Sequence, residues 1–304
     1  MPSTTVTNSV CNRASRWALS PLTLLLPILL AKAPTMPMYP CLNTSTIQPV
    51  ALSKKLPLIS KAGFRHVELW NDEIDLHLSV TGESILDVRK RIRDNGLTVC
   101  SVIAAMGWAD APEQEVDQVF DECRRRCEQA AQVGSNWIVA SPPMGHVSVN
   151  VMTDRLLRLL EIAEQLQIKP ILEFLGFTEQ YHSVSSVLEV LQSPALASTP
   201  VVADIYHMIR GGGALEDLLK FKPGQLGIFH INDLPAEPDF LVQTDYDRVM
   251  LGEGLIDLKH SIGLLNEIQF EGPVSLELFN KQLWQANPAD VLSVGFERLS
   301  ALIA

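Results

Sequence analysis

The 304-residue sequence is short of basic residues, with 24 lysines and arginines against 35 aspartates and glutamates. A protein that binds nucleic-acid backbones normally carries a basic patch. The densest basic run, residues 124–126, lies in a predicted helix beside Glu122 and Glu128, which indicates a solvated helix face. The net charge of −11 therefore argues against a nucleic-acid partner.

Cysteine is scarce as well, and its spacing excludes a disulfide-rich fold. The five cysteines are odd in number and form no framework of pairs. Cys123 and Cys127 lie four residues apart on a predicted helix, but no second pair completes a zinc site. Buried thiols in a reducing compartment are the favoured interpretation, and we expect a cytoplasmic protein.

The sequence has no dinucleotide-binding fingerprint and no apolar run of membrane-spanning length. Residues 252–254 read Gly-Glu-Gly, a turn rather than a G-x-G-x-x-G motif. The apolar run at residues 22–31 is too short to cross a bilayer. We therefore expect no stable membrane insertion.

Residues 1–36 do not match the rest of the chain. Two arginines precede the apolar run, and residues 31–33 have the small-x-small form of a signal-peptidase site. Pro34 directly afterwards argues against cleavage. Three interpretations stay open: a secretory signal, a loose anchor, or an extension upstream of a true start at Met36 or Met38. We favour the extension.

From residue 37 onward, short apolar runs alternate with helical patterns. The expected strands are residues 41–46, 65–70, 97–103, 136–141, 169–174, 200–205, 226–231 and 272–278. The clearest helical patterns are residues 84–95, 113–133, 153–167, 257–268 and 287–304. Several strands are continuously apolar, which is typical of parallel strands buried on both faces. The alternation predicts one (β/α)₈ TIM barrel over residues 37–304, a fold that needs about 250 residues.

Polar side chains end the last four predicted strands. They are Glu173, Asp204, His230 and Glu277. Active sites of such barrels lie at the carboxyl ends of the strands, and burying a charge there is costly unless it is paired or bound to metal. Any one of them alone is more often a loop cap or a core histidine, but four on successive strands predict one site. Its oxygen-rich donor set suits Mn²⁺, Mg²⁺ or Co²⁺, with Zn²⁺ also possible.

With these residues in place, the sequence resembles the sugar isomerase and epimerase superfamily of xylose isomerase-like barrels. The motifs that carry the resemblance are residues 171–174, 204–207, 230–233, 248–254 and 275–278. The resemblance implies that the four strand-end residues hold one metal and that His207 and Arg248 contact substrate. It also implies a sugar or cyclitol substrate and a homo-oligomer.

The chemistry agrees with the resemblance. Isomerising a hydroxy-ketone requires removal of a proton next to a carbonyl, and a metal can stabilise the enediolate that develops. Strands five and eight lie across a barrel from each other. We therefore expect Glu173 and Glu277 to act as acid and base, as well as metal ligands, on a small keto-sugar or keto-inositol.

Three other functions compete with this one. A dehydratase of the inosose or 3-dehydroshikimate type would use the same ligands and the same proton abstraction. A three-zinc DNA-repair nuclease would need a histidine at Val249, so it is disfavoured. A barrel that only binds its ligand is disfavoured by the intact ligand set.

Three further residues are candidates for substrate contacts. Glu68 ends the second predicted strand and either faces the pocket or forms a structural ion pair. His146 lies in the loop after the fourth strand. Trp108 follows the third strand and is a candidate wall of the pocket.

Overall fold

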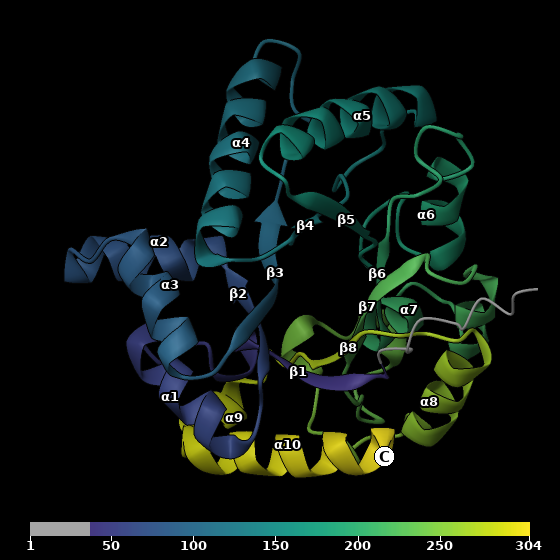
Figure 1. The fold of residues 1–304 in the computed structure, drawn as a ribbon. Helices are drawn as coiled ribbons and strands as arrows, with labels where there is room; N and C mark the ends of the chain where they lie inside the picture. Colours follow the sequence, from purple (N-terminus) through teal and green to yellow (C-terminus); the bar gives the residue numbers. More distant parts are fainter. Residues whose placement is uncertain (1–36) are drawn as a thin grey trace, which may run out of the picture. The chain divides into compact units, whose positions relative to one another are not determined.

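The computed structural model describes residues 37–304, and its centre is a closed barrel of eight parallel strands. Figure 1 shows the strands in the middle and the helices around them. The strands are β1 (Tyr39–Asn43), β2 (His66–Trp70), β3 (Thr98–Ala105), β4 (Trp137–Ala140), β5 (Lys169–Glu173), β6 (Val201–Asp204), β7 (Leu226–Ile231) and β8 (Pro273–Leu276). The predicted TIM barrel is confirmed. The interpretations of residues 1–36 lie outside the described residues.

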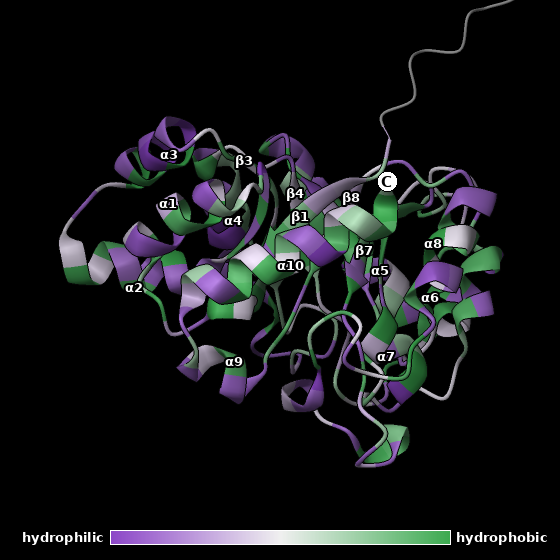
Figure 2. Ribbon diagram, turned by 90° about the horizontal axis from the view of Figure 1, so that it is seen from below, coloured by the Kyte–Doolittle hydropathy of each residue, from purple (hydrophilic) through white to green (hydrophobic). Residues whose placement is uncertain are grey.

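The helices follow the strands in alternation. They are α1 (Leu52–Ala62), α2 (Asn71–Thr81), α3 (Ile85–Asp94), α4 (Val116–Val133), α5 (Val149–Gln165), α6 (Val184–Val190), α7 (Ile205–Arg210), α8 (Leu258–Glu267), α9 (Lys281–Gln285) and α10 (Pro288–Ile303). The five helices predicted from the sequence are present, with ends shifted by up to four residues. In Figure 2 the ribbons of α8 and α10 alternate purple and green, as amphipathic helices do.

The interior of the barrel is filled by a layer of hydrophobic side chains, and the polar residues at the strand ends lie next to this layer. Ile171, Val202 and Ile228 are fully buried and belong to one small interior cluster. Each lies two residues before a polar strand end, and side chains two apart point to the same face of a strand. The same alternation therefore fills the barrel with hydrophobic side chains and places the polar groups one layer higher.

Helix α4 carries both the basic run and the two closely spaced cysteines. Arg125 and Arg126 of α4 both form ion pairs with Glu122, so this basic run is part of a mixed-charge surface. Cys123 and Cys127 are buried free thiols on the same helix, and burial raises their pKa values to about 11 and about 12. Among residues 37–304, no helix is long and apolar enough to cross a bilayer.

Candidate metal centre

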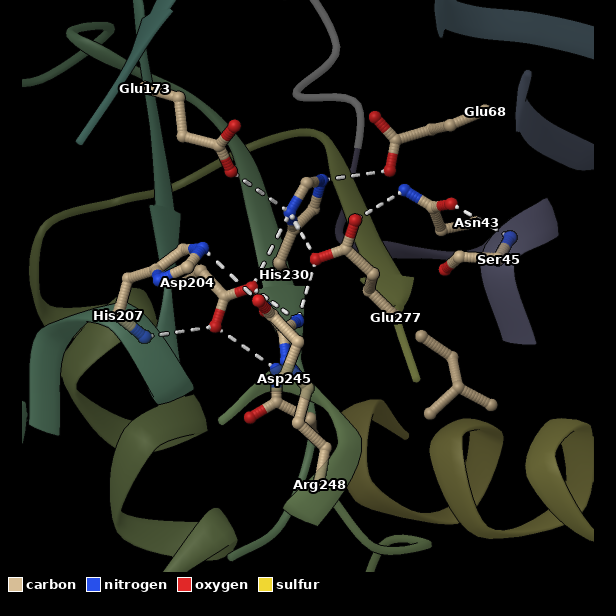
Figure 3. Close-up of polar contacts among 12 residues, drawn as sticks. Asn43, Ser45, Glu68, Glu173, Asp204, His207, His230, Asp245, Arg248 and Glu277 are labelled. Atoms are coloured by element: carbon tan, nitrogen blue, oxygen red, sulfur yellow. Dashed lines mark hydrogen bonds and ion pairs between the residues drawn. The ribbon is translucent and has the colours of Figure 1, made fainter. Parts of the chain in front are cut away.

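Four successive strands deliver one polar group each to the same end of the barrel. Asp204 and His230 are direct neighbours in the register between β6 and β7. Glu173 ends β5 beside them, and Glu277 follows β8, where its backbone N–H donates to the carbonyl of Ile231. Figure 3 shows these side chains converging on His230. The structure thus brings the four predicted ligands together.

The ring nitrogen Nδ1 of His230 is the point of convergence. It lies 3.2 Å from Glu277 Oε2, 3.5 Å from Glu173 Oε1 and 3.6 Å from Asp204 Oδ2. Glu173, Asp204 and His230 offer ligand atoms that all lie within 4.8 Å of one another. Glu277 joins them through its contact with the imidazole.

The other ring nitrogen of His230 faces a fourth carboxylate, that of Glu68. Nε2 of His230 lies 2.9 Å from Glu68 Oε2, and both side chains are almost completely buried. Glu68 Oε1 accepts a hydrogen bond of 2.5 Å from the hydroxyl of Ser101 on β3. The contact of Glu68 in the structure is therefore with His230, and the substrate contact predicted for it stays a prediction.

Arg248 reaches the cluster from the loop between β7 and α8. Its Nη1 donates to Asp204 Oδ2 at 2.9 Å and to Glu277 Oε2 at 2.7 Å. Its Nη2 donates to Asp245 Oδ1 at 2.5 Å. The guanidinium is buried over the ring of Tyr206, with Cζ 4.5 Å from the ring centroid. A planar, permanently charged group is thus fixed against two of the predicted ligands.

His207 lies beside Arg248 in the first turn of α7. The backbone N–H of Gly176 donates to His207 Nδ1 at 3.2 Å, and Nε2 lies 3.4 Å from Arg248 Nη2. Burial lowers the pKa of His207 to about 4, so the ring is neutral at pH 7. A Cβ atom at position 176 would lie 2.5 Å from the carbonyl oxygen of His207, so glycine permits this close approach.

The charges of the cluster shift its pKa values strongly. Burial raises the pKa of Glu173 to about 7. Burial alone would lower the pKa of His230, but the charges of Glu277 and Glu68 raise it well above its usual value. Burial opposes ionisation of Asp204 too, yet Arg248 holds the pKa of that carboxyl well below its usual range. Groups shifted in opposite directions at one place are typical of functional sites.

The donor set fits a divalent cation. Among the described residues, both ring nitrogens of His230 are buried and form no hydrogen bond, although carboxylate oxygens lie within 3.6 Å of each. A buried polar atom left unpaired among carboxylates requires an explanation, and a bound ion is one. One imidazole nitrogen with carboxylate oxygens suits Mn²⁺, Co²⁺ or Zn²⁺, and Mg²⁺ accepts the oxygens.

The remaining predicted residues lie away from these contacts. His146 is exposed in the loop after β4. Trp108 is fully buried and packs in the main core. Conversely, sequence reasoning missed Asn43 and Asp245, which bond to Glu277 and Arg248 respectively. Asn43 ends β1, as the ligands end later strands, and that position was the available signal.

Comparison with known proteins adds family evidence to this geometry. A family model described as a xylose isomerase-like TIM barrel matches residues 56–302. The chain is 24% identical to the inosose isomerase of Bacillus velezensis over 278 residues, which is 87% of this chain and 96% of that protein. It is 22% identical to a 3-dehydroshikimate dehydratase of Pseudomonas aeruginosa, covering 75% of this chain and 36% of that protein.

Solved structures give the same fold. The crystal structure of the IOLI protein with a binding zinc atom matches with a TM-score of 0.80 at 23% identity. The match covers 88% of this chain and 98% of that one.

Proposed function

The chain belongs to the family of xylose isomerase-like TIM barrels, and on that premise we propose that it is a divalent-metal-dependent isomerase or epimerase. Its substrate is a small keto-sugar or keto-inositol. The observation that carries the proposal is the convergence of three carboxylates on Nδ1 of His230, in a buried cluster at the carboxyl ends of the strands. The Bacillus velezensis relative is an inosose isomerase, which supports this proposal.

Glu173, Asp204, His230 and Glu277 would hold the cation. When bound, it would supply positive charge beside a carbonyl oxygen and a neighbouring hydroxyl of the substrate. Nδ1 of His230 faces these carboxylates, so the imidazole must be neutral at that atom for a cation to bind.

Glu173 and Glu277 flank His230 Nδ1 at 3.5 Å and 3.2 Å and are the proton carriers of this proposal. One carboxylate takes the proton from the carbon next to the carbonyl. The electron pair of that C–H bond forms the carbon–carbon double bond of an enediolate, and the π pair of the C=O bond moves to the carbonyl oxygen. The other returns a proton. Delivery to the same carbon on its other face gives an epimer. Delivery to the neighbouring carbon gives an isomer when the proton of the hydroxyl on the first carbon also moves to the former carbonyl oxygen.

Arg248 and His207 would bind substrate oxygens. The guanidinium carries a permanent charge against the developing negative charge, and it is fixed by Asp245 and by the ring of Tyr206. Since Nδ1 of His207 accepts from Gly176, the neutral ring carries its proton on Nε2. That N–H can donate to a hydroxyl or carbonyl oxygen.

The test is a screen of keto-sugars and keto-inositols with Mn²⁺, followed by NMR in D₂O. Glu277→Gln keeps the shape of the side chain but removes its basicity, so we expect deuterium exchange into the substrate to fall at least about 100-fold. Glu216→Gln makes the same change on an exposed carboxylate that pairs with His260, and it should leave exchange unaltered. Retained exchange in Glu277→Gln would contradict the proton-carrier role.

A dehydratase is the second candidate, favoured by the similarity to the 3-dehydroshikimate dehydratase. Loss of water β to a carbonyl begins with the same proton abstraction. The same NMR screen separates the two, because elimination produces an alkene signal and epimerisation does not. A protein that binds no divalent cation when purified without chelator would instead support a binding barrel without catalysis.

A further inference from the structure

Asn43 lies where the barrel closes. It ends β1, and β1 pairs with β8 through Leu42 and Leu276. Asn43 is therefore level with Glu277, the residue after Leu276, although 234 positions separate the two in the chain. Its side chain is fully buried. The pairing of β1 with β8 thus places the uncharged amide of Asn43 directly beside Glu277, a predicted metal ligand.

The orientation of this amide is fixed by its partners. Oδ1 of Asn43 accepts a hydrogen bond of 2.8 Å from the indole N–H of Trp70 and one of 3.1 Å from the backbone N–H of Ser45. Only an oxygen can accept from these two donors, so Nδ2 must face the other way. It donates to Glu277 Oε1 at 2.7 Å (Figure 3).

This bond distinguishes the two oxygens of Glu277. With Oε1 held by Asn43, Oε2 is the oxygen that faces His230 Nδ1 at 3.2 Å and Arg248 Nη1 at 2.7 Å. Glu173 is different, since among residues 37–304 it has no hydrogen-bond donor of this kind and meets His230 at 3.5 Å. The carboxylate of Glu277 is therefore oriented by a hydrogen bond from an amide, and that of Glu173 is not.

We propose that Asn43 is a positioning residue that orients the carboxylate of Glu277, so that one oxygen is bound by the amide and the other faces the shared centre. Trp70 contributes to this orientation, because its indole N–H donates to Asn43 Oδ1 and so disfavours a 180° flip of the amide. The inference rests on the proposed function, since it concerns a ligand of the proposed cation. Partners of this kind affect metal affinity by about 10–100-fold when removed.

The experiment measures Mn²⁺ affinity and the visible spectrum of the Co²⁺-loaded protein, neither of which requires a substrate. Asn43→Ala removes the donor to Glu277, and Asn43→Asp replaces that donor by an oxygen while keeping an acceptor for Trp70. We expect Asn43→Ala to weaken Mn²⁺ binding about 10–100-fold. Both variants should shift the Co²⁺ absorption bands, because a ligand oxygen changes its direction.

A matched control is available in Asn71, another fully buried asparagine. Its Nδ2 donates to Gln129 Oε1 at 2.6 Å and to the carbonyl of Arg126 at 3.3 Å, away from the centre. Asn71→Ala should lower the melting temperature without moving the Co²⁺ spectrum or the Mn²⁺ affinity. Equal affinity losses in Asn43→Ala and Asn71→Ala would overturn the inference, because the effect would then be general destabilisation.

Trp70→Phe keeps the test decisive if the Asn43 variants do not fold. It removes the indole N–H but retains an aromatic ring against Phe279, whose centroid lies 5.8 Å away. We expect a smaller shift of the Co²⁺ bands than in Asn43→Ala. A wild-type protein that binds neither cation refutes the proposed function together with the inference. A wild type that binds both, with unchanged Asn43 and Trp70 variants, refutes the inference alone.

Discussion

Both ring nitrogens of His230 face carboxylates, and these contacts fix the orientation of the imidazole ring. Three carboxylates lie on the Nδ1 side and Glu68 lies on the Nε2 side. Histidines that bind metals usually have a carboxylate or carbonyl on their second nitrogen, which fixes the ring and the tautomer. The buried pair of His230 and Glu68 has that geometry.

Cation binding at this cluster should depend on pH in a defined direction. The carboxylates raise the pKa of His230 well above its usual value, and burial raises that of Glu173 to about 7. Without a cation, both groups therefore hold protons at pH 6.5, and a cation has to displace them. Affinity should rise with pH by about tenfold per unit for each proton released.

Isothermal titration of Mn²⁺ in two buffers of different ionisation enthalpy, at pH 6.5 and 7.5, measures this proton count. Glu173→Gln should release fewer protons than wild type, because its amide cannot ionise. Affinity that is the same at both pH values would contradict the prediction.

At the scale of elements, the loop between β7 and α8 is organised by one buried carboxylate. Asp233 Oδ2 accepts from the backbone N–H groups of Gly252 and Gly254, and Oδ1 accepts from those of Leu234 and Ile256. A Cβ atom at position 254 would lie 2.3 Å from Asp233 Oδ1, so glycine is required there. This loop also carries Arg248, which donates to two of the proposed ligands.

Asp233→Ala should therefore cost about 2–4 kcal/mol of unfolding free energy, since it leaves several backbone donors without their acceptor. Urea unfolding measures the change. Asp257→Ala is the matched control, because Asp257 caps α8 through a single bond to the N–H of His260. Loss of a cap costs about 1 kcal/mol. The prediction fails if Asp233→Ala is no more destabilising than Asp257→Ala.

The elements also show what the sequence could and could not predict. β7 was predicted with both ends correct, because its run is apolar apart from one histidine. β1 was predicted to extend to residue 46, but the side chain of Asn43 accepts from Ser45 N–H and starts a 3₁₀ helix, Thr44–Ile47. α2 was missed because Leu76 and Val80 are exposed, so the helix has no one-sided apolar pattern.

At the scale of the whole barrel, local patterns predict the proposed ligands, but they do not predict the residues that hydrogen-bond to those ligands. The four proposed ligands could be brought into one hypothesis from the sequence because each lies at the end of an apolar run, which is a local pattern. Asn43 could not be assigned a partner, because its bond to Glu277 exists only after the first and last strands pair. The pairing of the first and last strands is thus what brings Asn43 to Glu277.

Closure makes a whole-molecule prediction about the start of the barrel. β1 pairs with β8 from Tyr39 onward, and the N–H of Tyr39 donates to the carbonyl of Gly272. These pairs use only residues after position 38. A chain that starts at Met36 should therefore keep the Mn²⁺ affinity of the full chain. Its Tm should change by less than about 2 °C, which is under roughly 1 kcal/mol for a barrel of this size.

A chain that starts at Cys41 is the control, because it lacks the pairs of Tyr39 with Pro273 and of Pro40 with Val274. It leaves Pro273 and Val274, the first two residues of β8, without their strand partners, so its Tm should fall well below that of the Met36 chain. Calorimetry and Mn²⁺ titration of the three chains decide the matter. If the Met36 chain loses as much as the Cys41 chain, residues 1–35 contribute to the stability of the barrel, and the division of the chain at residue 36 is wrong.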